Sequence, residues 1–259
     1  MDLDLDAGWK ISAINGNTGS AYMGINASKK IFLKRNTSPF LAALSAEGIT
    51  PKLIWTKRIA NGDVFIAQDW INGRTLTTTE MNGSSVVQLL QRVHSSHILR
   101  EILQQIDGHI LQPHQMINEY LLDLPTALRV NHFLNRVLHS LQTDLHRLSI
   151  KQVTVTHGDL NHKNWLLSDD KRLYLVDWDQ AILADPLYDI SFILINYIPE
   201  QQWQDWLVTY GMKWDDQIAL RINWYSKLIL LNTIKEQYQH QRFTMMNQCI
   251  LRLKTIIDK

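Results

Sequence analysis

The chain has 259 residues, of which 45% are hydrophobic and 20% charged, and its net charge is +1. This composition is typical of a globular protein, and the length suits one large domain or two lobes that share a cleft. The small net charge argues against a nucleic-acid partner and against a membrane-surface protein. Cys249 is the single cysteine, which excludes an intrachain disulfide and fits a reducing compartment.

The N-terminal sequence MDLDLDAGWK has neither the basic region nor the apolar region of a signal peptide. The most apolar runs, residues 190–198 and 228–234, fall short of the roughly 20 residues that a membrane helix needs. We therefore expect a cytoplasmic protein without membrane insertion.

The first seventy or so residues are predicted to be rich in strands. Short apolar or alternating runs occupy residues 9–14, 21–25, 29–35 and 63–71. Between the third and fourth runs, Ser38 is suited to cap a helix, Pro39 to begin it and Gly48 to end it. The pattern predicts antiparallel strands with one short helix among them.

The remainder of the chain is predicted to be mainly helical. Apolar residues recur at helical spacing in residues 84–97, and residues 131–148 form a long amphipathic pattern. Residues from 201 onward also have helical patterns. We predict an α+β fold of two lobes, with a β-rich N-lobe (1–73) that ends in a hinge and a larger helical C-lobe (74–259).

Two neighbouring segments, VTHGDLNHKNWLL (155–167) and LYLVDWD (173–179), combine strand-like runs with single polar residues. They predict two strands joined by a tight loop and a third strand, so that Asp159 and Asn164 share one side of a cleft and Asp177 ends beside Asn164. Such oxygen ligands, with room for water and phosphate, suit Mg²⁺. Asp159 is then free to accept a proton from a substrate hydroxyl, as in kinase-type phosphoryl transfer. A lone aspartate in a turn is usually only a cap, and it is the combination that favours catalysis.

A phosphate-binding region is predicted near the N-terminus. Gly16, Gly19 and Ser20 lie between two strand-like runs, where backbone N–H groups can approach anionic oxygens. Lys34, at the end of the next strand, is placed to reach the nucleotide phosphates, with Glu47 of the short helix as its acidic partner. The alternatives are a plain hairpin turn and a solvated strand end.

Two further residues have structural roles in this prediction. Asp189 opens a helix, so it either caps that helix or braces the catalytic loop by accepting its backbone N–H groups. His157 is expected to orient the same loop rather than to transfer protons.

The segments HGDLNHKN, LVDWD and DPLYDIS resemble the aminoglycoside phosphotransferase and choline kinase superfamily, whose fold is bilobal and protein-kinase-like. AYMG, IFLKRNTSPFL, AQDWINGRTL and YLVDWD further resemble the YtmP/CcrZ family of bacterial cell-cycle regulators. That resemblance implies ATP-dependent phosphorylation of ribose or 2-deoxyribose, control of chromosome replication and cell division, and FtsZ as a protein partner at the division site.

The resemblance also implies residue roles. Asp159 matches the catalytic base, and Lys34 matches the nucleotide lysine. The matched magnesium ligands are Asn164 and Asp177, with Asp179 as a second acidic residue after the metal aspartate. The matched hinge, whose backbone holds adenine, is Gln68, Asp69 and Trp70.

The sequence departs from protein kinases at three places. Asn161 stands where a protein kinase has a lysine, the Gly-rich loop is loose, and Asp177-Trp178-Asp179 replaces Asp-Phe-Gly. These departures favour a small-molecule acceptor over a protein.

The acceptor is predicted to be a neutral sugar. Residues 200–259 hold six acidic and eight basic residues, which argues against a polycationic aminoglycoside. Choline needs an aromatic cage, but Trp203, Trp206 and Tyr210 have the helical spacing of a core stripe. The alternatives are a choline, thiamine or aminoglycoside kinase, and a kinase-fold interaction module that acts mainly by binding a division protein such as FtsZ.

Overall fold

The computed structural model describes residues 8–14, 21–27, 29–59 and 61–257. Gly16, Gly19 and Ser20 lie outside these ranges, so their predicted phosphate contacts stay predictions. Contacts divide the chain into two units, residues 1–108 with 161–181 and residues 109–160 with 182–259. The first is called unit 1 and the second unit 2.

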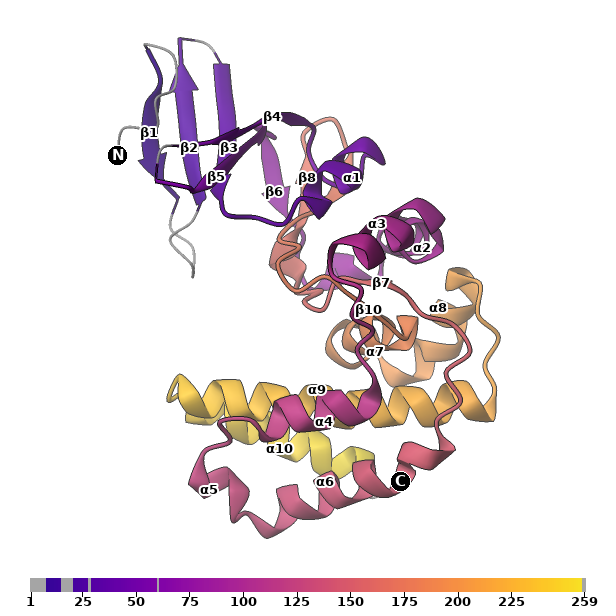
Figure 1. Cartoon of the computed structure of the whole chain (residues 1–259). Helices are drawn as coiled ribbons and strands as arrows, with labels where there is room; N and C mark the ends of the chain where they lie inside the picture. The colour runs from indigo at the N-terminus through magenta and orange to yellow at the C-terminus, as the bar shows by residue number, and fades with distance from the viewer. Residues whose placement is uncertain (1–7, 15–20, 28, 60, 258–259) are drawn as a thin grey trace. The chain divides into compact units, whose positions relative to one another are not determined.

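Unit 1 contains a five-stranded antiparallel sheet of order β1-β2-β3-β5-β4 (Figure 1). Its strands are β1 (Lys10–Ala13), β2 (Ala21–Asn26), β3 (Lys29–Arg35), β4 (Leu53–Arg58) and β5 (Val64–Asp69). Four of them confirm the predicted runs. The sequence patterns missed β4, because this edge strand has no fully buried residue and therefore no clear apolar alternation.

The two faces of this sheet have different roles. Leu33 and Ala67 are opposite each other on one face, where they form a buried cluster with Tyr22, Ile31 and Phe65. Lys34 is opposite Ile66 on the other face, because side chains alternate along a strand. The cluster thus anchors β3 while Lys34 is turned away from it.

The short helix α1 (Phe40–Ala46) confirms the predicted helix at residues 38–48. The Ser38 hydroxyl accepts a hydrogen bond from the Phe40 N–H at 3.2 Å. Gly48 ends the helix with a φ of 65°, a left-handed conformation that glycine adopts without steric cost. Local sequence signals therefore set both ends of α1.

Unit 1 also includes residues beyond the predicted boundary at 73/74. These elements are β6 (Gly73–Thr75), η1 (Thr79–Asn82), α2 (Ser84–Ser95), α3 (His97–Ile106), η3 (His162–Asn164), β8 (Trp165–Ser168) and β9 (Leu173–Leu175). Strand β8 pairs with both β6 and β9, while α3 packs against α1 and α2 packs against β9. Residues 161–181 therefore join the N-terminal elements through sheet pairing, which chain order alone did not indicate.

Unit 2 is mainly helical and holds one short antiparallel pair, β7 (Thr154–Thr156) with β10 (Ile182–Ala184). Its helices are α4 (Pro113–Leu121), α5 (Thr126–Arg129), α6 (His132–Asp144), η2 (Leu145–Arg147), α7 (Pro186–Tyr197), η4 (Glu200–Gln202), α8 (Trp203–Tyr210), α9 (Asp216–Gln239) and α10 (Phe243–Ile257). Helix α9 packs against α4, α6, α7 and α10 (Figure 1).

Helix α6 confirms the long amphipathic pattern, and Asn131 caps it by accepting from the N–H groups of Phe133 and Leu134. The antiparallel sheet and the helices together confirm the predicted α+β class. Within the described ranges, no helix is long and apolar enough to span a membrane.

Candidate active site

Lys34 is held by two carboxylates of unit 1. Its Nζ lies 2.8 Å from Oδ1 of Asp177 and 2.8 Å from each carboxylate oxygen of Asp179. The Lys34 side chain is 13% exposed, whereas those of Asp177 and Asp179 are 55% and 46% exposed. The structure therefore joins three predicted site residues in one cluster, with the cation inside and the anions toward solvent.

The environment of Lys34 favours its charged form. Burial lowers the pKa of Lys34, but the hydrogen bonds and negative charges of Asp177 and Asp179 outweigh it, so the pKa is raised overall. An ammonium group with this environment is charged at neutral pH and suited to bind phosphate oxygens.

The pairing of β8 with β9 brings Asn164 beside Asp177, as predicted. Trp165 is opposite Leu175, and the Val176 N–H donates to the Asn164 carbonyl at 2.9 Å. Asn164 is a member of this hydrogen-bonded pair, and Asp177 directly follows the other member, Val176. Asp177 has a φ of 67°, in the left-handed region that non-glycine residues seldom adopt and in which aspartate is enriched.

Trp178 fixes the loop that carries these two aspartates. Its side chain is buried, its indole N–H donates to the Leu175 carbonyl at 2.9 Å, and its ring meets Phe40 of α1 edge to face at 6.1 Å. Asp177 and Asp179 flank a residue that points into the core, so both can face solvent. The sequence showed Trp178 only as a departure from Asp-Phe-Gly and gave no sign of this role.

The structure does not bring Glu47 to Lys34. The Glu47 carboxylate accepts from the Ser96 hydroxyl at 2.5 Å, and its carbonyl accepts from Arg92. The acidic partners of Lys34 in the described residues are Asp177 and Asp179 instead. Glu47 directly follows the last turn of α1, and its side chain links that helix to Ser96, the residue between α2 and α3. The predicted Lys34–Glu47 pair is therefore wrong.

The predicted hinge lies at the end of β5. Gln68 pairs in the sheet with Phe32 and Leu53, and its buried amide donates to the Pro51 carbonyl at 2.8 Å. The Asp69 N–H donates to the Lys52 carbonyl at 2.8 Å. Trp70 follows the strand, outside the ladder. The Gln68 side chain thus has a structural role, and adenine binding by the hinge backbone stays a prediction.

The other half of the predicted site lies in unit 2, on the loop after β7. Asp189 accepts from the N–H groups of His157 at 2.7 Å and Gly158 at 3.1 Å. Nδ1 of the fully buried His157 accepts from the Asp159 N–H at 3.2 Å, and Gly158 has a φ of 80°. Of the two roles predicted for Asp189, the structure shows the brace. His157 orients the loop as expected, through a backbone N–H.

A buried cluster that sequence reasoning missed supports the helix carrying Asp189. Asp185 caps α7 by accepting from the Leu187 N–H at 3.0 Å, and it also accepts from Arg221 at 2.9 Å and from the Tyr225 hydroxyl at 3.1 Å. Burial raises the pKa of Asp185, and these donors only partly offset it. The motif DPLYDIS had suggested a cap at Asp189, whereas the cap is Asp185. Nothing in the sequence indicated the partners of Asp185 on α9, more than thirty residues away.

Several aromatic residues of unit 2 lie in its core, and the others are half-buried or exposed. Trp206, Tyr210, Trp224 and Tyr225 are all buried, and the rings of Trp206 and Tyr210 stack on each other at 5.8 Å. Trp206 and Tyr210 thus confirm two residues of the core stripe inferred from helical spacing, whereas Trp203 is only half-buried. Burial raises the pKa of Tyr188, as do the negative charges of Asp189, Glu119 and Asp159, so Tyr188 lies in the electrostatic neighbourhood of the catalytic loop.

The oxygen ligands in unit 1 fit a magnesium ion that is also bound by nucleotide. Two exposed carboxylates and the Asn164 amide are hard oxygen donors, and Mg²⁺ usually takes one or two carboxylates together with phosphates and water. No group of three or more His, Cys, Asp or Glu side chains in the described residues is arranged to hold a metal by itself. The donor set therefore suits a shared site better than a metal cage.

The class of protein follows from the fold and the site together. An antiparallel sheet and a helical unit, with the Lys34–Asp177–Asp179 cluster in the first and the loop braced by Asp189 in the second, are the features of a kinase-like phosphotransferase. Residues 34–222 match the phosphotransferase enzyme family, and the chain belongs to that family. Membership makes it an ATP-dependent kinase of small molecules.

Solved structures agree with this fold. Choline kinase LicA from Streptococcus pneumoniae is similar with a TM-score of 0.70 and 18% identity, over 96% of this chain and 95% of that one. A choline/ethanolamine kinase family protein from Mesorhizobium loti gives 0.68 and 15%, over 96% and 88%. Spectinomycin phosphotransferase, solved with ADP and spectinomycin, gives 0.65 and 16%, over 95% and 88%.

Proposed function

We propose that this protein transfers the γ-phosphate of Mg·ATP to a hydroxyl of a small neutral sugar, with ribose and 2-deoxyribose as the favoured acceptors. The observation that carries the phosphotransfer is the Lys34–Asp177–Asp179 cluster, with a cation suited to phosphates and exposed carboxylates suited to magnesium. The ADP-bound relative supports a nucleotide as donor. The neutral sugar rests on the YtmP/CcrZ resemblance and on the buried aromatic side chains, which leave fewer rings for a choline cage.

Each residue has one task in this mechanism. The Asp159 carboxylate accepts the proton of the acceptor hydroxyl as its oxygen forms a bond to the γ-phosphorus and the bond to ADP breaks. Lys34 would bind phosphate oxygens, and Asn164, Asp177 and Asp179 would hold magnesium, which would neutralise phosphate charge. His157 and Asp189 position the loop that carries Asp159.

The experiment is a measurement of ADP release from Mg·ATP over a panel of acceptors. The panel contains ribose, 2-deoxyribose, choline, thiamine and aminoglycosides. The proposal expects turnover above the ATPase background with a sugar and loss of turnover when EDTA removes magnesium. Turnover with choline alone would overturn the sugar, and no acceptor-dependent turnover from any of these classes would count against the proposed reaction.

A cellular role in division and chromosome replication, through FtsZ, belongs to the same proposal and rests on resemblance alone. An interaction module and an enzyme differ in their need for Asp159. If an Asp159→Asn variant restores cell shape in a deletion strain as well as the wild type does, catalysis is not the cellular role. The enzyme proposal expects the variant to fail while its level in the cell matches that of the wild type.

A further inference from the structure

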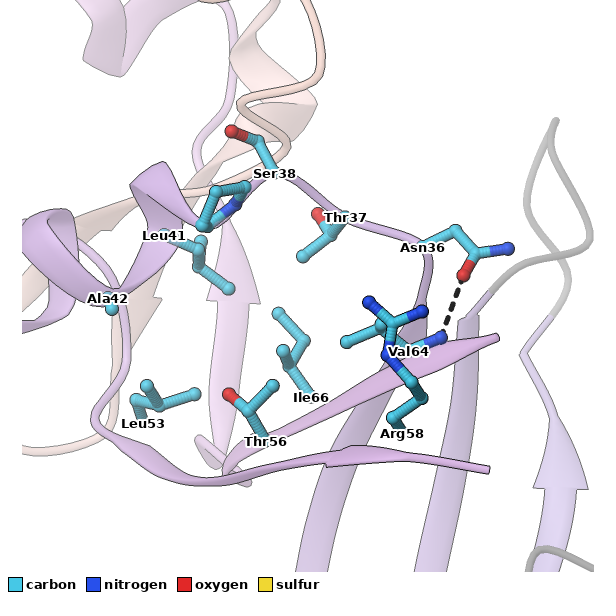
Figure 2. A pocket seen from close by; sticks show the side chains of 11 residues that line it. Asn36, Thr37, Ser38, Leu41, Ala42, Leu53, Thr56, Arg58, Val64 and Ile66 are labelled. Carbon is cyan, nitrogen blue, oxygen red and sulfur yellow. Dashed lines mark hydrogen bonds between the residues drawn. The ribbon is translucent and has the colours of Figure 1, made fainter. Parts of the chain in front are cut away.

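Unit 1 contains a cavity of about 500 Å³ that the catalytic residues do not line. One wall is α1 with the loop before it, and the other is formed by β4 and β5 (Figure 2). Lys34, Asp177 and Asp179 are absent from its lining, but the lining residue Thr37 donates to Asp179 at 3.5 Å, so the cavity adjoins the candidate active site without including its residues. Its volume is within the roughly 300–1,000 Å³ of small-molecule sites.

The body of the cavity is apolar. Leu41 and Ala42 of α1 face Leu53, Val64 and Ile66 of the two strands (Figure 2). A lining of aliphatic side chains favours a flat ring or a short hydrocarbon chain, because such a group removes apolar surface from water without losing hydrogen bonds.

One end of the cavity carries a positive charge. Arg58 of β4 lies at the end where Asn36 and Val64 meet, opposite Leu53 (Figure 2). The guanidinium donates to the Gly62 carbonyl at 3.3 Å, and among the described residues no carboxylate forms an ion pair with it. Its remaining N–H donors are available to an anionic group.

Asp63, which directly precedes the lining residue Val64, is already engaged by other side chains. Asp63 accepts from the Asn36 amide at 2.7 Å and from the Asn61 amide at 3.0 Å, and Arg35 lies 3.7 Å from its carboxylate. Asn36 in turn accepts from the Val64 N–H at 2.9 Å. Because Arg35 offsets the charge of Asp63, the charge of Arg58 makes this end of the cavity net positive.

We propose that this cavity binds a small amphipathic anion, with an apolar ring or chain between α1 and the two strands and a carboxylate, sulfonate or phosphate at Arg58. The occupant contacts the Asn36–Pro39 loop, which directly follows the β3 strand that carries Lys34. The site is thus a second ligand site beside the nucleotide-binding segment, and it goes beyond the proposed phosphotransfer.

The test measures binding of 8-anilinonaphthalene-1-sulfonate by fluorescence to the full chain and to four variants. Ala42→Phe and Thr56→Trp fill the cavity from exposed positions on its two walls. Arg58→Gln removes the charge. Lys57→Gln is the matched control, because the neighbouring residue of β4 points to the opposite face of the sheet. Circular dichroism and thermal unfolding confirm that each variant is folded.

We expect saturable binding to the wild type, weakening with either filling variant, and no change with Lys57→Gln. Arg58→Gln should weaken binding about ten-fold, which corresponds to the loss of ~1.4 kcal/mol of binding free energy. N-phenyl-1-naphthylamine has the same rings without the sulfonate, and Arg58→Gln should leave its affinity unchanged.

Two results would overturn the inference. If both filling variants bind 8-anilinonaphthalene-1-sulfonate as tightly as the wild type does, the probe binds elsewhere. Weakening by the filling variants with no effect of Arg58→Gln would overturn the anionic class of ligand. Either result is independent of whether the protein transfers phosphate, because the measurement uses no nucleotide.

Discussion

The carboxylate of Asp179 contacts the ammonium group of Lys34 through both of its oxygens, each 2.8 Å from Nζ. With Asp177 at the same distance, one cation offsets two anions on a short loop. Magnesium and nucleotide phosphates would supply the same two kinds of charge, so we expect Lys34 and the two aspartates to exchange partners when Mg·ATP binds.

Lys34→Met should therefore change two affinities in opposite directions. Loss of the ammonium removes a phosphate contact, so the affinity for ATP should fall about ten-fold, as loss of ~1.4 kcal/mol predicts. The affinity for Mg²⁺ alone should rise, because two carboxylates lose their competing cation. Calorimetric titrations measure both, with Lys29→Met, an exposed residue of the same strand, as the control. Weaker Mg²⁺ binding in Lys34→Met would contradict this exchange.

Asp189→Asn should loosen the catalytic loop. The carboxylate accepts from two backbone N–H groups, and an amide offers a single acceptor oxygen, so one buried donor loses its partner at a cost of about 1–3 kcal/mol. Hydrogen exchange at His157 and Gly158 should accelerate. Asp205→Asn makes the same change in the first turn of α8 at an exposed position and should have no such effect. Unchanged exchange at both amides would exclude the brace.

The buried pair of Asp185 and Arg221 should be costly to break. Arg221→Met leaves a buried carboxylate without its counter-charge, and such losses typically cost about 3–5 kcal/mol. The variant raises the pKa of Asp185 further, so protonation relieves the cost and the difference from the wild type should shrink as pH falls. Urea unfolding at several pH values measures it, with exposed Lys213→Met as the control. A pH-independent difference would argue against an ionised Asp185.

Tyr225→Phe tests the third member of this cluster more gently. The ring keeps its packing against Trp224 and Tyr188, while Asp185 loses one donor. We expect a loss of about 1.5–3 kcal/mol in unfolding free energy, the range for a hydrogen bond to a charged group. In a double-mutant cycle, Asp185→Asn should remove most of this effect, and additive losses would show that the two side chains do not interact.

Glu80 provides a pH dependence at the surface of unit 1. It accepts from Arg74 and from the N–H and hydroxyl of Thr77, and these bonds lower its pKa from 4.5 to about 2. Because the folded-state pKa is depressed, the stability that Glu80 contributes is present above 4.5 and is lost as pH falls toward 2. An NMR titration of the Glu80 carboxyl should show this value and a higher one in Arg74→Gln. Equal values in both proteins would disprove the pairing.

Local chemistry made several elements predictable. Ser38 and Gly48 bound α1 because a cap hydroxyl and a positive φ act within a few residues. The pairing of β8 with β9, and with it the proximity of Asn164 and Asp177, followed from two apolar runs separated by a short turn.

Contacts between distant segments were not predictable in this way. Asp185 and Arg221 are 36 residues apart, and neither the spacing nor the composition between them favours that pair over another. Glu47 was expected at Lys34 because both follow the pattern of a kinase N-lobe, but Ser96, 49 residues away, takes its carboxylate. Such pairs depend on how helices pack, which hydrophobic periodicity leaves open.

The most direct test of the proposed chemistry compares acceptor-dependent ADP formation by the wild type and Asp159→Asn, with ATP binding measured for both. Asp159 is proposed as the general base, a role typically worth about 10²–10⁴ in rate. The variant should therefore lose at least about 10² in kcat while its affinity for ATP is unchanged, since Lys34 and the magnesium ligands are intact. Near-normal turnover by Asp159→Asn at saturating acceptor would contradict the proposal.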